Sequence, residues 1–153
     1  MKRITTGGDE TGALAAAVAE VAQRGDLITL VGGLGAGKTR FVQGFAASVN
    51  VGEPATSPTF ALVHVYDGCA RVVHADLYRL TSEHEVLDLG LDEARADGAV
   101  VLVEWGDLAG DLLGPDRLTI TVSIVDDTTR SFEFDGWPDR ADELDLKTQR
   151  WQA

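Results

Sequence analysis

The sequence contains few of the residues on which several classes of protein depend. Among its 153 residues there is one cysteine, Cys69, which excludes an internal disulfide and a metal site built from several cysteines. No apolar run approaches the roughly 20 residues that a membrane-spanning helix needs. Residues 1–8 carry charges without the apolar core of a secretory signal behind them. We therefore expect a soluble, cytoplasmic protein that does not enter a membrane.

Basic residues are also scarce. Thirteen lysines and arginines stand against 25 aspartates and glutamates, and the net charge is −12. A surface this acidic repels nucleic acid, because tight binding of DNA or RNA depends on cationic contacts with phosphates. We therefore expect no direct, tight binding of nucleic acid, and we expect any role in nucleic-acid metabolism to run through protein partners.

The sequence does contain a phosphate-binding loop pattern. Residues 32–39 read Gly-Gly-Leu-Gly-Ala-Gly-Lys-Thr and follow the apolar run 27–31, as the pattern Gly-x-x-x-x-Gly-Lys-[Ser/Thr] requires. Glycines let the backbone turn so that successive N–H groups face phosphate oxygens. Lys38 can reach the β- and γ-phosphates, and Thr39 can bind Mg²⁺. The pattern predicts a site for a nucleoside triphosphate; the alternative is a glycine-rich turn with a solvated lysine.

The remaining pattern is typical of a small α/β protein. Helical spacing follows Asp9, Gly37 and Ser82, and runs typical of strands lie at 4–6, 27–31, 60–66, 71–75, 99–103, 117–124 and 131–134. The dipeptide at 67–68, Asp-Gly, predicts a tight hairpin. We expect a three-layer P-loop NTPase-like domain over residues 1–135, with a mostly parallel sheet and an inserted antiparallel hairpin. The tail, residues 136–153, is either helical or loose.

Hydrolysis of a triphosphate also needs carboxylates near the loop. Asp76 and Glu104 each follow an apolar strand, and ligands gather at the C-terminal ends of strands in open α/β sheets. We interpret both as candidate catalytic residues, with solvated strand ends as the alternative. The hydroxyls of 56–59 could close over the γ-phosphate or form an ordinary turn. Trp105 could stack near the nucleotide or fill the core, and the three histidines are too dispersed to predict a metal cluster.

Four segments occur together in an order that resembles a known family. They are 34–39 (Leu-Gly-Ala-Gly-Lys-Thr), 56–60 (Thr-Ser-Pro-Thr-Phe), 74–80 (His-Ala-Asp-Leu-Tyr-Arg-Leu) and 102–105 (Leu-Val-Glu-Trp). The series resembles the bacterial tRNA threonylcarbamoyladenosine biosynthesis ATPase family (TsaE, formerly YjeE) over about residues 9–124. Gly33 and Gly106 depart from the pattern, which often has an acidic residue and a proline at these places.

The resemblance implies an ATPase that binds ATP and Mg²⁺. Its implied partners are a threonylcarbamoyl-transferase and that enzyme's inactive, kinase-fold-like partner protein, which together modify N6 of an adenosine in tRNA; ATP hydrolysis would support their turnover. It implies catalytic roles for Lys38, Asp76 and Glu104, and Mg²⁺ binding by Thr39 and Glu104. Nucleotide contacts are implied for Gly8, Thr11, Gly33, Leu34, Gly35, Ala36, Gly37, Lys38, Thr39, Arg40, Thr59 and Trp105.

Three other functions of proteins with phosphate-binding loops are alternatives to an ATPase of this family. A GTPase reads guanine with Asn-Lys-x-Asp, but the sole asparagine, Asn50, precedes Val51. A small-molecule kinase carries an arginine-rich lid, whereas the arginines here are scattered, with Arg40 and Arg79 the best placed. A nucleotide-gated adaptor, in which hydrolysis is incidental, stays open. Measuring ATP hydrolysis with the partners present distinguishes such an adaptor from an ATPase.

Overall fold

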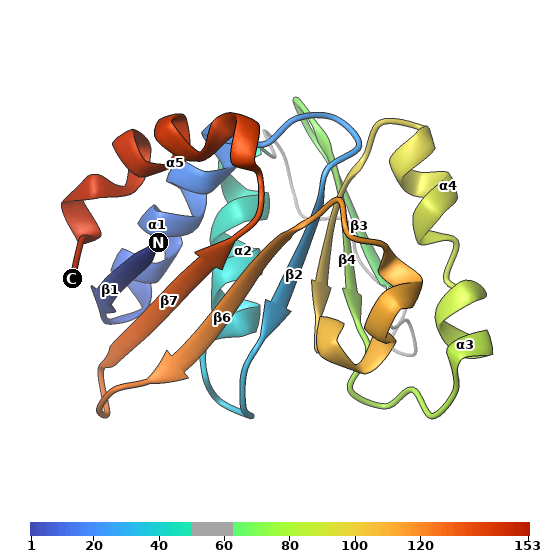
Figure 1. The fold of residues 1–153 in the computed structure, drawn as a ribbon, viewed down its shortest axis with the longest axis horizontal. Coiled ribbons are helices and arrows are strands. Elements are labelled where there is room, and N and C mark those ends of the chain that lie inside the picture. Colours follow the sequence, from blue (N-terminus) through green and yellow to red (C-terminus); the bar gives the residue numbers. More distant parts are fainter. Residues whose placement is uncertain (50–62) are drawn as a thin grey trace.

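The computed structural model describes residues 1–49 and 63–153. Thr59 and its neighbours at 50–62, including the start of the strand predicted at 60–66, lie outside these residues. In the described part of the chain, seven strands form one sheet in the order β1-β7-β6-β2-β5-β4-β3 (Figure 1). The strands are β1 (Lys2–Thr6), β2 (Leu27–Val31), β3 (Val63–Asp67), β4 (Arg71–Asp76), β5 (Val100–Glu104), β6 (Leu118–Ile124) and β7 (Thr129–Asp135). The α-helices are α1 (Gly8–Val21), α2 (Lys38–Val49), α3 (Glu83–Leu87), α4 (Leu91–Ala96) and α5 (Ala141–Thr148), and the 3₁₀ segments are η1 (Gly106–Leu113), η2 (Pro138–Arg140) and η3 (Gln149–Trp151).

The sheet is mixed. Its four central strands are parallel, because β2 pairs with β5 and β6 and β5 pairs with β4 in that sense. Antiparallel pairs lie outside them: β7 joins β6 to β1, and β3 pairs with β4. The expected parallel sheet is therefore confined to the centre, and the predicted hairpin forms an edge. Short connections explain the difference, since a tight turn between β6 and β7 can join only antiparallel strands.

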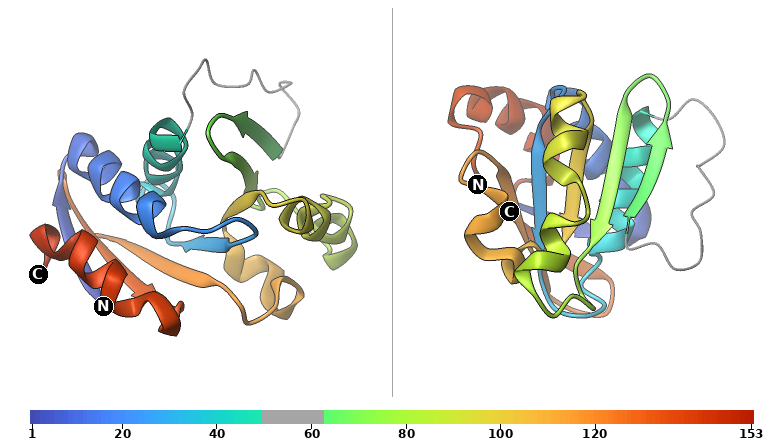
Figure 2. Two further views of the ribbon diagram at one scale, coloured as in Figure 1. Left: turned by 90° about the horizontal axis from the view of Figure 1, so that it is seen from above. Right: turned by 90° about the vertical axis from the view of Figure 1, so that its right-hand side faces the viewer.

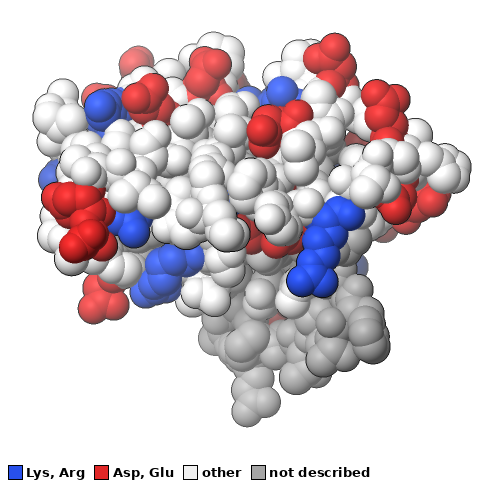
Figure 3. Space-filling view, turned by 90° about the horizontal axis from the view of Figure 1, so that it is seen from below, with Lys and Arg blue, Asp and Glu red and all other residues white. Residues whose placement is uncertain are grey.

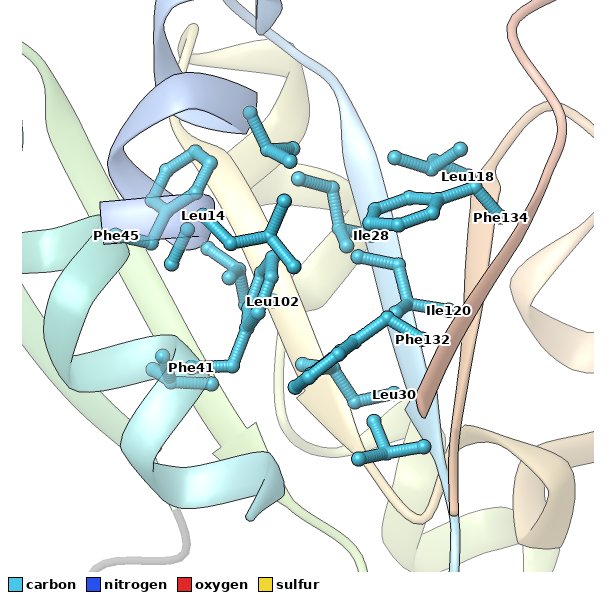
Figure 4. Close-up of a cluster of buried hydrophobic side chains, with 14 of the residues drawn as sticks. Leu14, Ile28, Leu30, Phe41, Phe45, Leu102, Leu118, Ile120, Phe132 and Phe134 are labelled. Carbon is cyan, nitrogen blue, oxygen red and sulfur yellow. The ribbon is translucent and has the colours of Figure 1, made fainter. Parts of the chain in front are cut away.

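Two apolar clusters lie on opposite faces of the sheet. Along β2, Ile28 and Leu30 belong to one cluster and Leu27 to the other, as the alternation of side chains along a strand requires. Helices α1 and α2 cover the first face (Figure 2), and Figure 4 shows Leu14 and Phe41 pointing toward the strand side chains. Residues of α3, α4 and η1 complete the second cluster. Helical segments therefore cover both faces.

Helices α1 and α2 pack closely enough that one contact requires glycine. A Cβ added at Gly44 of α2 would lie 2.5 Å from the Cα of Gly12 in α1, a separation at which backbone has to move. The two glycines thus set how closely α1 and α2 approach at the middle of α2. The phosphate-loop pattern ends in the first turn of the same helix, so the position of α2 determines where the loop ends.

The C-terminal residues are helical and pack against the first cluster. Trp137, Leu144 and Trp151 are buried there. The guanidinium of Arg3, 2% exposed, donates from Nε to Thr148 Oγ1 at 2.8 Å and pairs with the carboxylate of Asp145. Figure 1 shows α5 beside α1 at one end of the molecule. In the described ranges, no helix combines the length and apolar character needed to cross a membrane.

Candidate functional site

The loop between β2 and α2 forms one wall of a pocket at the C-terminal ends of the parallel strands. The pocket has a volume of about 260 Å³ and is lined by Leu34, Gly35, Ala36, Gly37, Lys38, Thr39, Arg40, Asp76, Tyr78, Glu104 and Trp105. Figure 3 views the molecule from below, the end toward which β2 runs in Figure 1. Basic and acidic side chains both stand among mostly uncharged ones on this face.

Lys38 is buried inside its own loop. Its Nζ donates to the carbonyl oxygens of Gly32 at 2.6 Å and Gly33 at 2.8 Å, and it lies 4.0 Å from the centre of the Trp105 ring. Burial lowers the pKa of the ammonium, and nearby carboxylates, chiefly that of Glu104, oppose the shift. Two carbonyls and an aromatic face thus hold a desolvated cation at the centre of the loop.

Glu104 ends β5 with both carboxylate oxygens engaged. Its Oε1 accepts a hydrogen bond from Thr39 Oγ1 at 2.7 Å, and its Oε2 lies 2.6 Å from Nε2 of His74. The side chain is 3% exposed. Burial raises the pKa of Glu104, but interactions with His74 and Thr39 and the charge of Lys38 outweigh burial, so the pKa lies below its ordinary value. The group is an ionised, oriented carboxylate near neutral pH.

Asp76 joins Glu104 through the strand register. The two residues are directly paired at the ends of β4 and β5, so their side chains lie on the same face of the sheet. Asp76 Oδ1 accepts a hydrogen bond from the backbone N–H of Tyr78 at 3.0 Å. The carboxylate is partly exposed to the pocket. The two carboxylates expected from the sequence are therefore brought to one side of the phosphate loop.

Trp105 follows β5 in a left-handed backbone conformation, with φ 59°. The backbone N–H of Trp105 donates to the carbonyl of Leu30 at 2.9 Å, which connects the turn to the end of β2. The ring contacts Tyr78, with centroids 5.0 Å apart, and packs over the Lys38 ammonium. A positive φ is unfavourable for a bulky side chain. The contacts with Tyr78 and Lys38 hold the Trp105 ring at the pocket despite this.

Comparison with protein-family models finds a match over most of the chain. The model described as "Threonylcarbamoyl adenosine biosynthesis protein TsaE" matches residues 5–132. The chain belongs to the TsaE family. A relative in Bacillus subtilis, the tRNA threonylcarbamoyladenosine biosynthesis protein TsaE, is 41% identical over 135 residues, 88% of this chain and 84% of its own. The protein of the same name in Treponema pallidum is 33% identical over 85% of this chain and 96% of its own.

A solved structure extends the likeness of this TsaE-family chain to three dimensions. The crystal structure of Bacillus subtilis YdiB has a TM-score of 0.78 and 34% sequence identity. The likeness covers 98% of this chain and 94% of that one. The α/β architecture with a seven-stranded mixed sheet is therefore shared with a solved relative over almost the whole chain.

The structure brings some of the expected nucleotide contacts together and leaves others apart. Arg40 lines the pocket. Gly8 lies beside the Arg40 side chain, since a Cβ added at Gly8 would be 3.1 Å from Arg40 Nε. Gly33 contributes a carbonyl to Lys38. By contrast, the hydroxyl of Thr11 is buried and lies 2.8 Å from the hydroxyl of Thr5, so it does not face the pocket.

Two residues in this TsaE-family site were not assigned a role from the sequence. Tyr78 lies on the Trp105 ring, and His74 bonds to Glu104. One signal pointed to His74: it stands two residues before Asp76 in β4, which places both side chains on one face of the strand. Nothing in the sequence indicates that β5 lies next to that strand.

Oxygen donors in the pocket suit Mg²⁺. Thr39 Oγ1 and Glu104 Oε1 lie 2.7 Å apart, and Mg²⁺ in phosphate-transfer sites is held by one or two protein oxygens together with substrate phosphates. Within residues 1–49 and 63–153, no group of three or more histidine, cysteine or acidic side chains is arranged to hold a metal. The pair fits a metal that a triphosphate brings with it, not a metal bound by protein alone.

Proposed function

We propose that the protein is an ATPase that binds ATP with Mg²⁺ and hydrolyses it in support of tRNA threonylcarbamoyladenosine formation. The observation that carries the proposal is the juxtaposition of Lys38, held inside the loop, with the hydrogen-bonded pair of Thr39 and Glu104. A cation and a hydroxyl–carboxylate pair that line one pocket fit a phosphate chain and its metal. Residues 1–135 would form the P-loop NTPase-like unit that carries this chemistry, with 136–153 as its C-terminal extension.

ATP would be held mainly through its phosphates. The backbone of 33–37 supplies N–H donors, and the start of α2 adds the positive end of a helix dipole. Lys38 would exchange the carbonyls of Gly32 and Gly33 for phosphate oxygens. Arg40 and Gly8 lie beside the loop and would contact the remainder of the nucleotide, as would Trp105. Thr59, outside the described residues, and Thr11 are further proposed contacts, the latter requiring its hydroxyl to leave Thr5.

Hydrolysis joins the oxygen of a water molecule to the γ-phosphorus and breaks the bond to the oxygen that bridges to the β-phosphate. ADP leaves with that electron pair, and the proton of the water passes to the phosphate or to solvent. Lys38 would stabilise negative charge on the phosphates, and Asp76 would orient the water. Thr39 and Glu104 would hold Mg²⁺, which would supply positive charge to the phosphates when bound.

Membership of the TsaE family supports a role in threonylcarbamoyladenosine biosynthesis. The partners we propose are the threonylcarbamoyl-transferase and its kinase-fold-like companion. The protein's net charge of −12 makes direct, tight contact with tRNA unfavourable. Contact with the substrate tRNA would therefore run through those partners, and ATP turnover would act on the protein assembly.

Steady-state ATP hydrolysis tests the proposal. The pure protein would be assayed alone and with the transferase pair, with Lys38→Ala as the blank. We expect slow hydrolysis alone and strong stimulation by the pair, both lost in Lys38→Ala. Tight ATP binding without hydrolysis under either condition would contradict an ATPase and favour a nucleotide-gated adaptor.

A further inference from the structure

His74 is a buried side chain that the proposed chemistry does not use. It is 7% exposed and pairs directly with Leu102 of β5. Glu104 lies two residues further along β5, so the two side chains share a face and stand diagonally across the strand pair. Their separation, 2.6 Å between Nε2 and Oε2, is that of a short charge-assisted hydrogen bond.

The Glu104 carboxylate is held from two sides. Thr39 reaches Oε1 from the first turn of α2, and His74 reaches Oε2 from β4. Because an ionised carboxylate can only accept hydrogen bonds, the imidazole must carry its proton on Nε2. Rotation of the carboxylate would break both bonds inside a buried site. Its two oxygens therefore have different fixed surroundings.

We propose that His74 is a positioning residue for ATP hydrolysis: it holds Oε2 of Glu104 so that Oε1 stays on Thr39, facing the side where the metal and phosphates bind. This inference rests on the function proposed above. It assigns His74 no contact with ATP. Partners that orient a metal-binding side chain commonly change metal affinity or activity 10- to 100-fold when they are removed.

A second histidine lies beside the first. His64 of β3 is the direct cross-strand partner of His74, and their rings are stacked with centroids 5.6 Å apart and 30° between planes. Of the two rings, His74 is the one that makes the hydrogen bond to Glu104. His64→Leu is therefore a matched control, since it removes a neighbouring imidazole and leaves the bond to the carboxylate.

The activity test compares His74→Leu, His74→Gln and His64→Leu with the wild type, each with the partner pair and saturating ATP. For His74→Leu we expect kcat to fall 10- to 100-fold and half-saturation to need more Mg²⁺. Binding of ATP in EDTA should change less than threefold, because Lys38 donates to the carbonyls of Gly32 and Gly33 and not to His74. Glutamine carries an amide donor near the Nε2 position, so His74→Gln should recover most of the rate, and His64→Leu should stay within threefold.

A spectroscopic test needs neither ATP nor metal. In protein labelled with ¹⁵N-histidine, we expect a protonated Nε2 on His74 whose N–H proton shifts upfield in Glu104→Gln, since a neutral amide is a weaker acceptor than a carboxylate. An unprotonated Nε2, or a resonance that Glu104→Gln leaves unchanged, would overturn the proposed bond. Thermal unfolding of each variant shows whether a loss of ATP hydrolysis or of ATP binding is caused by misfolding.

The outcomes separate the two proposals. If the wild type hydrolyses ATP and His74→Leu does so equally well, the positioning role is wrong and the ATPase stands. If His74→Leu and His74→Gln lose ATP binding in EDTA as well as kcat, His74 has a general structural role and the inference is overturned. If the wild type hydrolyses no ATP with its partners, both proposals fall.

Discussion

Replacing Glu104 by glutamine removes one charge from the pocket and leaves its shape. The carboxylate is 3% exposed and accepts two short hydrogen bonds. At about 6 Å and an effective dielectric of about 20, a carboxylate and one phosphate charge repel by about 3 kcal/mol. Screening by the Lys38 ammonium reduces this repulsion, so we expect metal-free ATP to bind Glu104→Gln roughly 5- to 30-fold more tightly, about 1–2 kcal/mol.

Hydrolysis by the same variant should change in the opposite direction. A neutral amide holds Mg²⁺ more weakly than a carboxylate, and stabilisation of transition-state charge then falls. We expect kcat with Mg²⁺ to drop about 100-fold, which corresponds to about 2.7 kcal/mol. Fluorescence polarisation of labelled ATP in EDTA measures binding, and phosphate release with the transferase pair measures turnover.

Asp107→Asn is the matched control for Glu104→Gln. Asp107 also interacts with the charge on Lys38, but it is exposed, so solvent screens it and we expect both readouts within threefold of wild type. Wild-type hydrolysis by Glu104→Gln would refute the assigned role. A loss of both ATP binding and hydrolysis would refute the electrostatic reasoning, because it would indicate that the substitution disrupts the structure of the pocket.

Three further predictions concern the framework. Gly44→Ala places a methyl group against Gly12, and we expect it to lower the free energy of unfolding by about 1–3 kcal/mol in urea titrations. Arg3→Met removes buried charge-assisted bonds and should cost about 1–3 kcal/mol, whereas Lys147→Ala breaks an exposed ion pair and should cost less than about 1 kcal/mol; equal losses would contradict this. Backbone N–H donors hold the pKa of Glu85 below its ordinary value, so its stabilisation is present above about pH 4.3 and is lost as pH falls through the lower folded pKa. Thermal unfolding from pH 6 to pH 3 should therefore show a smaller decline for Glu85→Gln than for the wild type.

Local chemistry explains which elements the sequence could predict. The apolar run at β2 and the glycines after it favour a strand and a turn. The helix expected after Ser82 forms as α3, and Ser82 and Glu85 make a capping box at its start. The hairpin at Asp67-Gly68 joins β3 to β4. Segments α4 and η1 were not predicted, because each is short and lacks a sustained period.

Features that depend on strand order could not be predicted from the chain alone. The bond between His74 and Glu104 requires β4 to lie beside β5, and nothing local to either strand specifies its neighbour. The position of Thr11 is a similar case: its hydroxyl meets Thr5 because α1 packs against β1. The resemblance to the TsaE family implied a nucleotide contact for Thr11, but the burial of its hydroxyl against Thr5 is a tertiary effect.

The hydrogen bonds within the pocket bear on the expected rate. Lys38 already has two carbonyl acceptors and an aromatic face, and Glu104 already has two donors. In the proposed ATPase, phosphates and metal would replace satisfied contacts, so part of the binding energy would be used to exchange bonds. We therefore expect slow hydrolysis by the protein alone. Partner contact that drew the exposed Tyr78 ring from Trp105 would loosen the cover on Lys38 and speed the exchange, so Tyr78→Ala should raise the basal rate and reduce the fold stimulation by the transferase pair.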